Sequence, residues 1–223
     1  MAVVQYDHMV EVERKYELTR VKPQVLRYRL RQLKAKRLGT VRQVDTYYSP
    51  PHRTFLGRPL YLRLRETVKG RVKHAQFEYH VAYAHFAARE HEVPVADARV
   101  LKYILKSLGF VRELQVKKRR ETWKSGGVQV ELDQVTGLGS FIELEVMGRG
   151  QRAALRLITP LARKLGLMES QRSPGYFKLL LQRQRPAAWR KYYDKKLKIK
   201  NQNVMPTADH PQGEKMIINN TSH

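Results

Sequence analysis

Residues 11–15 of the chain read Glu11-Val12-Glu13-Arg14-Lys15, an alternation of charged and apolar side chains that is typical of a β-strand. Side chains two residues apart in a strand point to the same face, so Glu11, Glu13 and Lys15 would lie side by side. Successive members would be about 7 Å apart at roughly 3.3 Å per residue. Two carboxylates on one face repel each other unless a cation lies between them. The stretch is therefore a candidate hard-metal site with a basic side chain beside it.

The composition excludes several classes of protein. The chain has 223 residues, 42% of them hydrophobic, which is enough for one sizeable core. It contains no run of 18 apolar residues and no basic-then-apolar leader, so we expect neither a membrane span nor a signal peptide. Without cysteine it has no disulfide, no catalytic thiolate and no cysteine-bound zinc. We expect a cytoplasmic protein, with the nucleus as an alternative because of its charge.

The charge is strongly positive: 44 Lys and Arg against 20 Asp and Glu give a net +24. Such an excess favours a polyanionic partner, namely nucleic acid, polyphosphate, a nucleotide or an anionic membrane surface. A solvated cationic surface without a ligand is the alternative. The segment 183–223 carries nine basic and three acidic residues, so most of the excess belongs to the body of the chain.

Alternating patterns predict about eight strands in hairpin order, and longer periodic stretches predict helices. Strands are expected over 9–18, 41–48, 60–68, 74–83, 86–93, 111–123, 128–135 and 141–147, and helices over 23–36, 98–108, 151–165 and 176–182. Several strands carry charge on one face and aliphatic residues on the other. A sandwich would expose the charged face to water, whereas a closed barrel could enclose it and bury the outer aliphatic face under helices.

The alternating charges fall into two sets. The acidic set is Glu11, Glu13, Glu131, Asp133, Glu143 and Glu145, and the basic set is Lys15, Arg63, Arg65, Arg89, Lys118 and Arg120. Each pair alone is typical of an exposed strand face, a basic patch or a cross-strand ion pair. If all face one lumen, the carboxylates could hold a divalent cation and the cations could bind phosphates. Oxygen-only ligands favour Mg²⁺ or Mn²⁺, so a metal-bound triphosphate is the natural occupant.

These motifs resemble the CYTH superfamily, the triphosphate tunnel metalloenzymes, over about residues 8–182. The hallmark Glu-x-Glu-x-Lys matches residues 11–15, and further matches are Asp45-Thr46-Tyr47-Tyr48, Leu62-Arg63-Leu64-Arg65-Glu66, Lys118-Arg119-Arg120, and the segment Glu131 to Glu145. The resemblance implies an α+β fold, an eight-stranded antiparallel barrel forming the tunnel, with helices packed outside. It places this domain over 1–182. A basic extension over 183–223 would follow, partly helical and then disordered.

The resemblance also implies roles for individual residues. Glu11, Glu13 and Glu143 would be the principal ligands of Mg²⁺ or Mn²⁺, with Asp133 and Glu145 supporting them. The triphosphate would be held by Arg63, Arg65, Lys118 and Arg120, with Arg89 and His80 as further candidates. Lys15 would orient or deprotonate the nucleophile, although a lysine acts as a base only if its pKa falls, so a role as phosphate ligand stays open.

Two departures from the family pattern bear on the reaction. His80 stands where members usually carry a lysine in the fourth strand; it could donate to a phosphate, or be an ordinary core or surface histidine. The cyclase branch carries a His-Phe pair upstream of the hallmark, where this chain has Val4-Gln5-Tyr6-Asp7. Conversely, Thr136 to Glu145 resembles class IV adenylyl cyclases. Asp45 to Tyr48 and Leu181 to Pro186 resemble animal-type thiamine triphosphatases.

We therefore predict metal-dependent hydrolysis of inorganic triphosphate, thiamine triphosphate or a nucleoside triphosphate. The alternative is an adenylyl cyclase that converts ATP to cyclic AMP and pyrophosphate. A third hypothesis is an RNA 5′-triphosphatase, or a non-catalytic binder of polyphosphate or nucleic acid that uses the basic surface and tail. A homodimer is left open.

Overall fold

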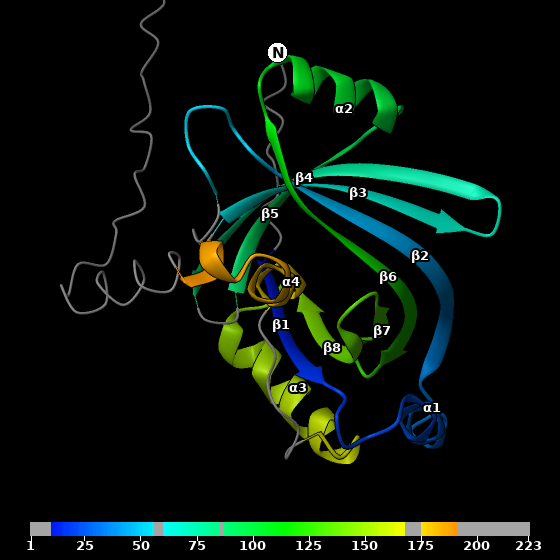
Figure 1. Cartoon of the computed structure of the whole chain (residues 1–223). Coiled ribbons are helices and arrows are strands. Elements are labelled where there is room, and N and C mark those ends of the chain that lie inside the picture. Colours follow the sequence, from blue (N-terminus) through cyan, green and yellow to red (C-terminus); the bar gives the residue numbers. More distant parts are fainter. Residues whose placement is uncertain (1–9, 56–59, 85–86, 168–174, 191–223) are drawn as a thin grey trace, which may run out of the picture.

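The computed structural model describes residues 10–55, 60–84, 87–167 and 175–190, except the side chains at positions 10, 82–84 and 87–89. The strands are β1 (Val10–Glu17), β2 (Lys36–Ser49), β3 (Leu60–Lys69), β4 (Val72–Ala84), β5 (Ala87–Pro94), β6 (Val111–Ser125), β7 (Val128–Val135) and β8 (Gly139–Met147). The helices are α1 (Pro23–Gln32), α2 (Ala98–Ser107), α3 (Gln151–Lys164) and α4 (Tyr176–Gln184) (Figure 1). None of these helices is long and apolar enough to cross a membrane.

The strands form a closed antiparallel barrel in the order β1-β5-β4-β3-β2-β6-β7-β8, with β8 returning to β1. The α+β class and the eight-stranded barrel predicted from the sequence are confirmed. Two connections, from β1 to β2 and from β5 to β6, do not join neighbouring strands. β2 pairs with β6, and β1 fills the remaining gap, because it pairs with β5 on one side and with β8 on the other. The hallmark motif on β1 therefore forms the seam that closes the barrel.

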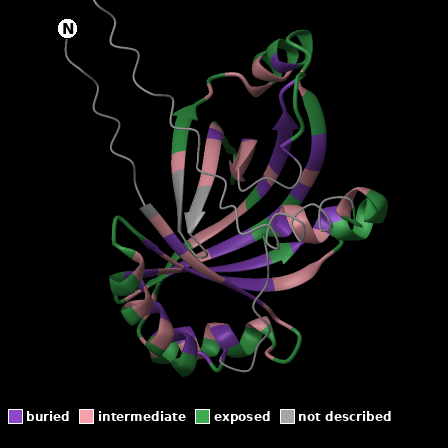
Figure 2. Cartoon of the chain, turned by 90° about the vertical axis from the view of Figure 1, so that its left-hand side faces the viewer, coloured by how far each residue is buried: buried purple, intermediate pink, exposed green. Residues whose placement is uncertain are grey.

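Alternation gives every strand an outer and an inner face. The outer apolar side chains of β1, β7 and β8, such as Val12, Val130 and Leu144, form the largest core cluster with α1 and α3. A second outer cluster joins α2 to β2, β3 and β4 through Leu105, Tyr48 and Leu64. Buried segments follow the strands, and exposed segments follow the turns and the outer helix faces (Figure 2). The charged residues that alternate with these outer apolar ones on β1, β7 and β8, such as Glu13, Glu131 and Glu143, point into the lumen.

Helix α4 differs from the other helices because it packs against inward-facing residues. Tyr176 and Leu180 of α4 share a buried cluster with Tyr47, Val116 and Phe141, which all lie on the inner face of their strands. Figure 1 shows α4 between β1 and β6. The sequence predicted a short helix here, but not that it would cover the inner face at one end of the barrel.

Helix α1 ends earlier than the sequence predicted, at Gln32 rather than near Lys36, and Lys36 begins β2. The reversal occurs at Lys34, which has φ 52°, while the backbone N–H groups of Lys34 and Ala35 donate to the carbonyls of Arg31 and Leu30. This pattern terminates a helix without glycine. Helix α4 runs to Gln184, across the predicted domain boundary after 182. The rest of the predicted extension, from 191, lies outside the described residues.

Candidate active site in the barrel lumen

Strand register brings the predicted carboxylates together on the inner wall of β1, β7 and β8. Glu13 pairs with Glu145 and Lys15 with Glu143 across the β1–β8 seam. On the other side of β8, Glu143 pairs with Glu131. Residues far apart in the sequence therefore share one stretch of barrel wall, and only the closed sheet produces this grouping.

Lys15 lies within this carboxylate wall as a buried cation. Its Nζ is 3.0 Å from Glu143 Oε1 and 3.2 Å from Glu13 Oε1. Burial alone would lower the pKa of Lys15, but the Glu13 and Glu143 carboxylates raise it well above its usual range. Lys15 is therefore fully protonated in this arrangement, which favours the binding of an anion over the removal of a proton.

Arg120 connects the carboxylates of β7 and β8. Its Nε and Nη2 donate to the two carboxylate oxygens of Asp133 at 2.8 and 2.6 Å, and Nη2 also donates to Glu143 at 2.6 Å. Its Nη1 forms an ion pair with Glu131. Burial alone would raise the pKa of Glu143, but Arg120 and then Lys15 hold it well below its usual range. Glu143 is thus ionised and able to act as a metal ligand.

Asp45 organises the basic wall formed by β2, β3 and β6. Arg65 donates to both of its carboxylate oxygens at 2.8 and 3.0 Å, and Lys118 and Arg63 each come within 3.7 Å. Burial opposes ionisation, yet Arg65 and then Lys118 hold the pKa of Asp45 far below its usual range. Asp45 belongs to the motif Asp45-Thr46-Tyr47-Tyr48, but no role was predicted for it. Its alternation with Tyr47 on β2, opposite Arg65 and Arg63, was the signal that could have identified it.

Among the described basic side chains of the lumen, Lys118 lies farthest from its nearest carboxylate oxygen. It is only 5% exposed, and its Nζ lies 3.6 Å from Asp133 and 3.7 Å from Asp45, longer than a strong hydrogen bond. Burial, and after it the positive charge of Arg120, lowers the pKa of Lys118. An anion placed between Lys118 and Arg120 would relieve this repulsion, so this part of the lumen is a candidate anion site.

The carboxylates opposite the basic wall are crowded. Burial and then the negative charge of Glu131 raise the pKa of Glu145 to about 8. The pKa of Glu131 is raised to about 7 because burial outweighs the attraction of Arg120. Burial and Glu13 raise the pKa of Glu11 well above its usual range. Buried, crowded carboxyl groups of this kind hold protons at neutral pH. They offer only oxygen ligands, which suit Mg²⁺ or Mn²⁺, and such a cation would replace those protons on binding.

The charges of the lumen do not balance. Among the described side chains that take part in these contacts, five Lys and Arg meet nine carboxyl groups, which are Glu11, Glu13, Asp45, Glu78, Glu90, Glu131, Asp133, Glu143 and Glu145. The five cations are Lys15, Arg63, Arg65, Lys118 and Arg120. Where Glu11, Glu131 and Glu145 lose their protons, a phosphate chain would meet net repulsion in this lumen unless divalent cations entered with it. The residues therefore fit a metal-bound anion better than either partner alone.

The remaining predicted residues have different surroundings. Asp133 accepts hydrogen bonds from both Arg120 and Tyr176, so it is more strongly engaged with protein groups than Glu145. His80 faces the lumen and contacts Glu90, not a cationic wall. The backbone of Arg89 pairs with Val10 and Val81, but its side chain lies outside the described set. None of the predicted ligands Glu11, Glu13 and Glu143 belongs to a described group of three whose ligand atoms lie within 4.8 Å of one another.

Tyr176, the first residue of α4, also contacts the predicted site residues, although no role for it was predicted from the sequence. Its hydroxyl donates to Asp133 Oδ2 at 2.9 Å, and its ring lies 4.5 Å from Lys15 Nζ and 5.2 Å from Lys118 Nζ. Cations over an aromatic face are attracted by the ring quadrupole. No pattern within residues 176–182 indicates this role, because it arises only from where α4 packs.

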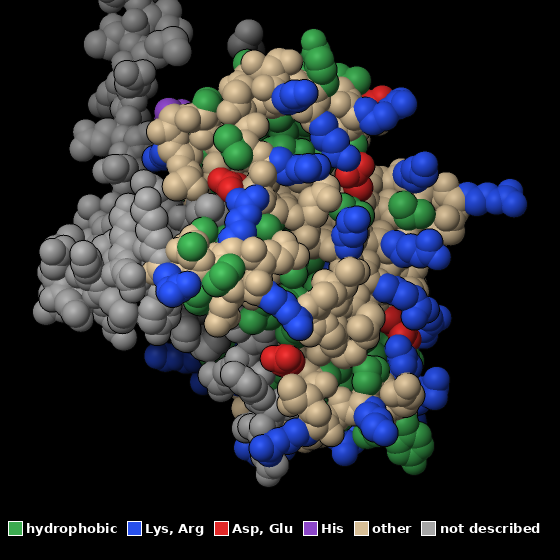
Figure 3. Space-filling view, viewed as in Figure 1, with side chains coloured by type: hydrophobic (Ala, Val, Ile, Leu, Met, Phe, Trp, Pro, Cys, Tyr) green, Lys and Arg blue, Asp and Glu red, His purple; other side chains and the backbone are tan. Residues whose placement is uncertain are grey.

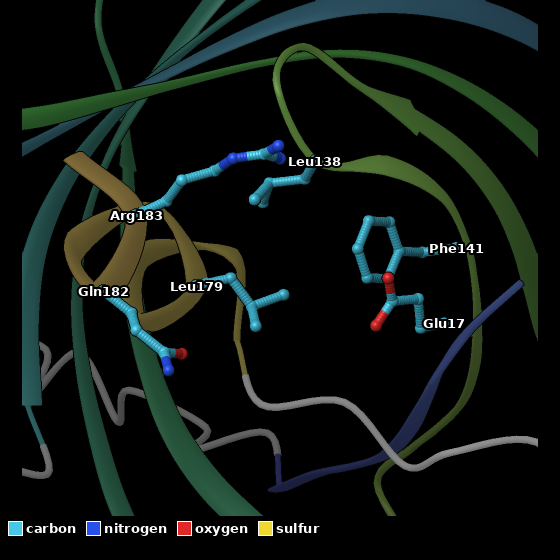
Figure 4. A pocket seen from close by; sticks show the side chains of 6 residues that line it. All are labelled: Glu17, Leu138, Phe141, Leu179, Gln182 and Arg183. Carbon is cyan, nitrogen blue, oxygen red and sulfur yellow. The ribbon is translucent and has the colours of Figure 1, made fainter. Parts of the chain in front are cut away.

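A separate cavity of about 300 Å³ lies between α4 and the β7–β8 turn. Figure 4 shows Leu179 and Arg183 of α4 on one side of this cavity. Phe141 and Glu17 lie next to each other across it, and Leu138 lies near the end of the Arg183 side chain. None of the predicted site residues lines this cavity. It belongs to the packing of α4 at the barrel end and does not extend the lumen site.

The outer surface carries much of the positive charge. Figure 3 shows Lys and Arg side chains spread over one face of the molecule with few acidic ones between them. On β6, exposed Lys117 and Arg119 alternate with buried Lys118 and Arg120, so one strand supplies cations to both faces. The basic exterior would attract polyanions toward the molecule without contacting the lumen.

Comparison with known proteins gives the family. The sequence model of the CYTH domain matches residues 9–176, which is most of the chain. A putative adenylate cyclase of Methanocaldococcus jannaschii, MJ0240, is 39% identical over 56 residues. That match covers 25% of this chain and 32% of the relative. The aligned part thus spans about a third of the curated relative.

Solved structures show the same architecture. The PH1012 protein of Pyrococcus horikoshii aligns with a TM-score of 0.64 and 29% identity, covering 74% of this chain and 95% of that one. A putative adenylyl cyclase of Hippeastrum, HpAC1, aligns with a TM-score of 0.53 and 13% identity, covering 91% of this chain and all of that one. At 13% identity, this second likeness concerns the fold alone.

Proposed function

This chain belongs to the CYTH domain family, and we propose that it hydrolyses a triphosphate in the barrel lumen with the help of Mg²⁺ or Mn²⁺. CYTH members are triphosphatases or adenylate cyclases, and both chemistries act on a metal-bound triphosphate. What supports the proposal in this chain is the division of one lumen into an acidic wall on β1, β7 and β8 and a basic wall on β2, β3 and β6.

The basic wall supplies the phosphate contacts. Arg65 and Arg120 are already held by Asp45 and Asp133, which fixes the direction of each guanidinium. Lys118 lies between these two carboxylates at longer range and has donor capacity left for a phosphate oxygen. A preorganised cationic surface of this kind stabilises the charge that moves onto the leaving phosphate oxygens.

The acidic wall would hold the metal through Glu11, Glu13 and Glu143, with Glu145 next to them. A divalent cation held by these residues would supply positive charge that offsets the negative charge of the phosphates. To hold a metal ion, these carboxylates must be ionised and fixed in position. Glu143 meets both conditions through Arg120 and Lys15, whereas Glu145 must lose a proton first.

Lys15 would then act as a cation at the junction of the two walls. Its raised pKa keeps the ammonium charged, so it would bind the anionic substrate or orient the attacking water. We assign it no role as a base. The water's proton would pass to solvent or to a phosphate oxygen.

Phosphate release from tripolyphosphate, with Mg²⁺, Mn²⁺ or EDTA, tests the proposal directly. We expect metal-dependent turnover that Lys118→Ala reduces about 100-fold, because a buried phosphate-binding cation is lost. Lys117→Ala is the matched control, since Lys117 is the neighbouring residue of β6 and is exposed on the outer face. Equal activity of the two variants, or no phosphate release with either metal, would contradict the proposal.

Adenylyl cyclase activity is the second candidate, favoured by the similarity to the Methanocaldococcus putative adenylate cyclase. The same lumen could hold ATP while its 3′-hydroxyl attacks the α-phosphate and pyrophosphate leaves. The Hippeastrum protein, a putative adenylyl cyclase, has a dominant triphosphatase activity, so one fold accommodates both descriptions. Chromatography of products from ATP separates them: cyclic AMP with pyrophosphate indicates cyclisation, and inorganic phosphate indicates hydrolysis.

A further inference from the structure

Three potential metal ligands meet on a part of the lumen wall that the proposed reaction does not use. Glu78 and His80 lie two residues apart on the inner face of β4, and Glu90 lies directly opposite His80 on β5. One ligand atom from each lies within 4.8 Å of the other two. Among the residues whose side chains are described, no other group of three His, Cys, Asp or Glu meets this criterion.

One oxygen of this group is buried and unused. Glu78 is 1% exposed, and its Oε2 accepts a hydrogen bond of 2.9 Å from Arg63 Nε. Its Oε1 has no hydrogen-bond partner. That oxygen is 4.0 Å from His80 Nδ1, which is too far for a hydrogen bond. Because buried acceptors are almost always satisfied, an unsatisfied carboxylate oxygen beside a histidine nitrogen indicates a missing ligand.

The histidine is held in a fixed orientation for such a ligand. Its ring stacks on Tyr61 with centroids 4.2 Å apart and an interplanar angle of 9°. Its Nδ1 lies 2.9 Å from Glu90 Oε1. Arg63 fixes Glu78 through a hydrogen bond, so Glu78 and His80 are oriented by groups outside the set of candidate ligands, namely Arg63 and the Tyr61 ring. All three stand on paired strands, which keeps their spacing rigid.

The distances suit one small cation. Ligands about 2.1 Å from a shared ion lie about 3.0–3.4 Å from each other in tetrahedral or octahedral geometry. The His80–Glu90 separation of 2.9 Å lies just below this range and the His80–Glu78 separation of 4.0 Å lies above it, so a small adjustment of each side chain would bring the atoms to ligand spacing. His80 and Glu90 are each about one-sixth exposed, at 17% and 15%, so an ion has a route from solvent.

We propose that Glu78, His80 and Glu90 bind one divalent transition-metal ion of the Zn²⁺ class, at a site on β4 and β5 that adjoins the acidic wall where Glu90 shares a hydrogen bond with Glu11. One imidazole nitrogen with two carboxylate oxygens suits Zn²⁺ and its first-row neighbours, whereas Mg²⁺ prefers oxygen ligands alone. Three protein ligands leave at least one coordination position for solvent or another oxygen donor. The proposal stands whether or not the protein hydrolyses triphosphates, because it concerns binding alone.

Calorimetric titration of the full-length protein with Zn²⁺, in a large excess of Mg²⁺, tests this site. The Mg²⁺ occupies oxygen-only ligands, so the remaining Zn²⁺ binding reports sites that contain nitrogen. We expect one Zn²⁺ per chain at this site, with affinity reduced at least tenfold in His80→Gln and in Glu90→Gln. Neither substitution removes the Arg63–Glu78 pair, and circular dichroism would verify the fold of each variant.

His91→Gln is the matched control. His91 is the residue next to Glu90 on β5, is exposed, and stacks on Tyr79 instead of Tyr61. Its substitution should leave Zn²⁺ affinity unchanged. Replacement of Zn²⁺ by Co²⁺ gives a second readout. The visible absorption of the nitrogen- and oxygen-bound ion should disappear in His80→Gln and persist in His91→Gln.

Three results would overturn the proposal: no Zn²⁺ binding in the presence of Mg²⁺, equal affinity in the wild type and His80→Gln, or an equal loss in His91→Gln. The second would assign the binding to other histidines of the chain, and the first would leave water as the partner of Glu78 Oε1. A protein without triphosphatase activity that still binds Zn²⁺ through His80 would refute only the proposed function.

Discussion

Lys15 Nζ lies 3.0 Å from Glu143 Oε1, across the strand pair that closes the barrel. The first and last strands thus contribute opposite charges to one ion pair. The carboxylates raise the pKa of Lys15, and Arg120 and then Lys15 outweigh burial and lower that of Glu143, so the pair is ionised at neutral pH. This relationship determines how substitutions of Lys15 should behave.

Lys15→Arg should retain activity within about tenfold of the wild type, while Lys15→Met should lose about 100-fold in kcat/KM. An arginine keeps the charge but cannot act as a base near neutral pH. Phosphate release at saturating metal measures both variants. If Lys15→Arg were as inactive as Lys15→Met while remaining folded, a proton-transfer role would be favoured instead.

Arg120→Met should destabilise the protein by about 3–5 kcal/mol, because it leaves buried carboxylates without their cation. The double variant Arg120→Met/Asp133→Asn should recover part of this loss, since one of the stranded charges is removed with it. Urea unfolding monitored by circular dichroism gives both values. Arg119→Met, on the exposed face of the same strand, should change stability by less than about 0.5 kcal/mol. Similar losses at positions 119 and 120 would argue against the buried network.

The metal-free protein should become less stable as pH rises from about 5 to about 8. The pKa of Glu131 is about 7 and that of Glu145 about 8 in the folded chain, against about 4.3 when unfolded. A carboxyl group with a raised folded pKa stabilises the fold below its unfolded pKa. That contribution is lost as pH rises through the folded value. We expect a loss of about 2 kcal/mol, or roughly 4–8 °C in Tm.

Thermal unfolding with EDTA and with Mg²⁺ checks this pH dependence. Mg²⁺ should remove most of the decline, because it replaces the protons between the carboxylates. Glu145→Gln should reduce the decline, whereas Glu121→Gln should not, because Arg37 and Arg27 lower the pKa of Glu121 and keep it ionised throughout this range. A Tm that rises with pH in EDTA would contradict the assignment.

Tyr176→Phe should cost about 1–2 kcal/mol of stability, because the buried Asp133 carboxylate loses one charge-assisted hydrogen bond but keeps Arg120. The ring would still face Lys15 and Lys118. Tyr176→Ala should cost more, since the ring that joins α4 to the lumen is also removed. Chemical unfolding of the two variants orders these effects, and an equal cost would show that the hydroxyl contributes nothing beyond the ring.

The sequence predicted the barrel because alternation marks each strand, and the sign of the alternating charges marks the inner face. It placed Glu13, Glu143 and Arg120 on that face without knowing which strands are neighbours. The partners of Asp45 and Glu78 were not predicted, because they depend on the register between β2, β3 and β4. Tyr176 could not be predicted either, since a helix periodicity shows which residues share a face but not what that face covers.

The seam between β1 and β8 has a consequence for how the protein is made. β1 is synthesised early, but its hydrogen-bonding partner β8 emerges only after every other strand, and such long-range pairings form slowly. Carboxylates that share a wall in the finished barrel stay dispersed along the nascent chain until that pairing forms. The stretch of inner wall that Glu13, Lys15 and Glu143 share therefore exists only once that pairing has formed.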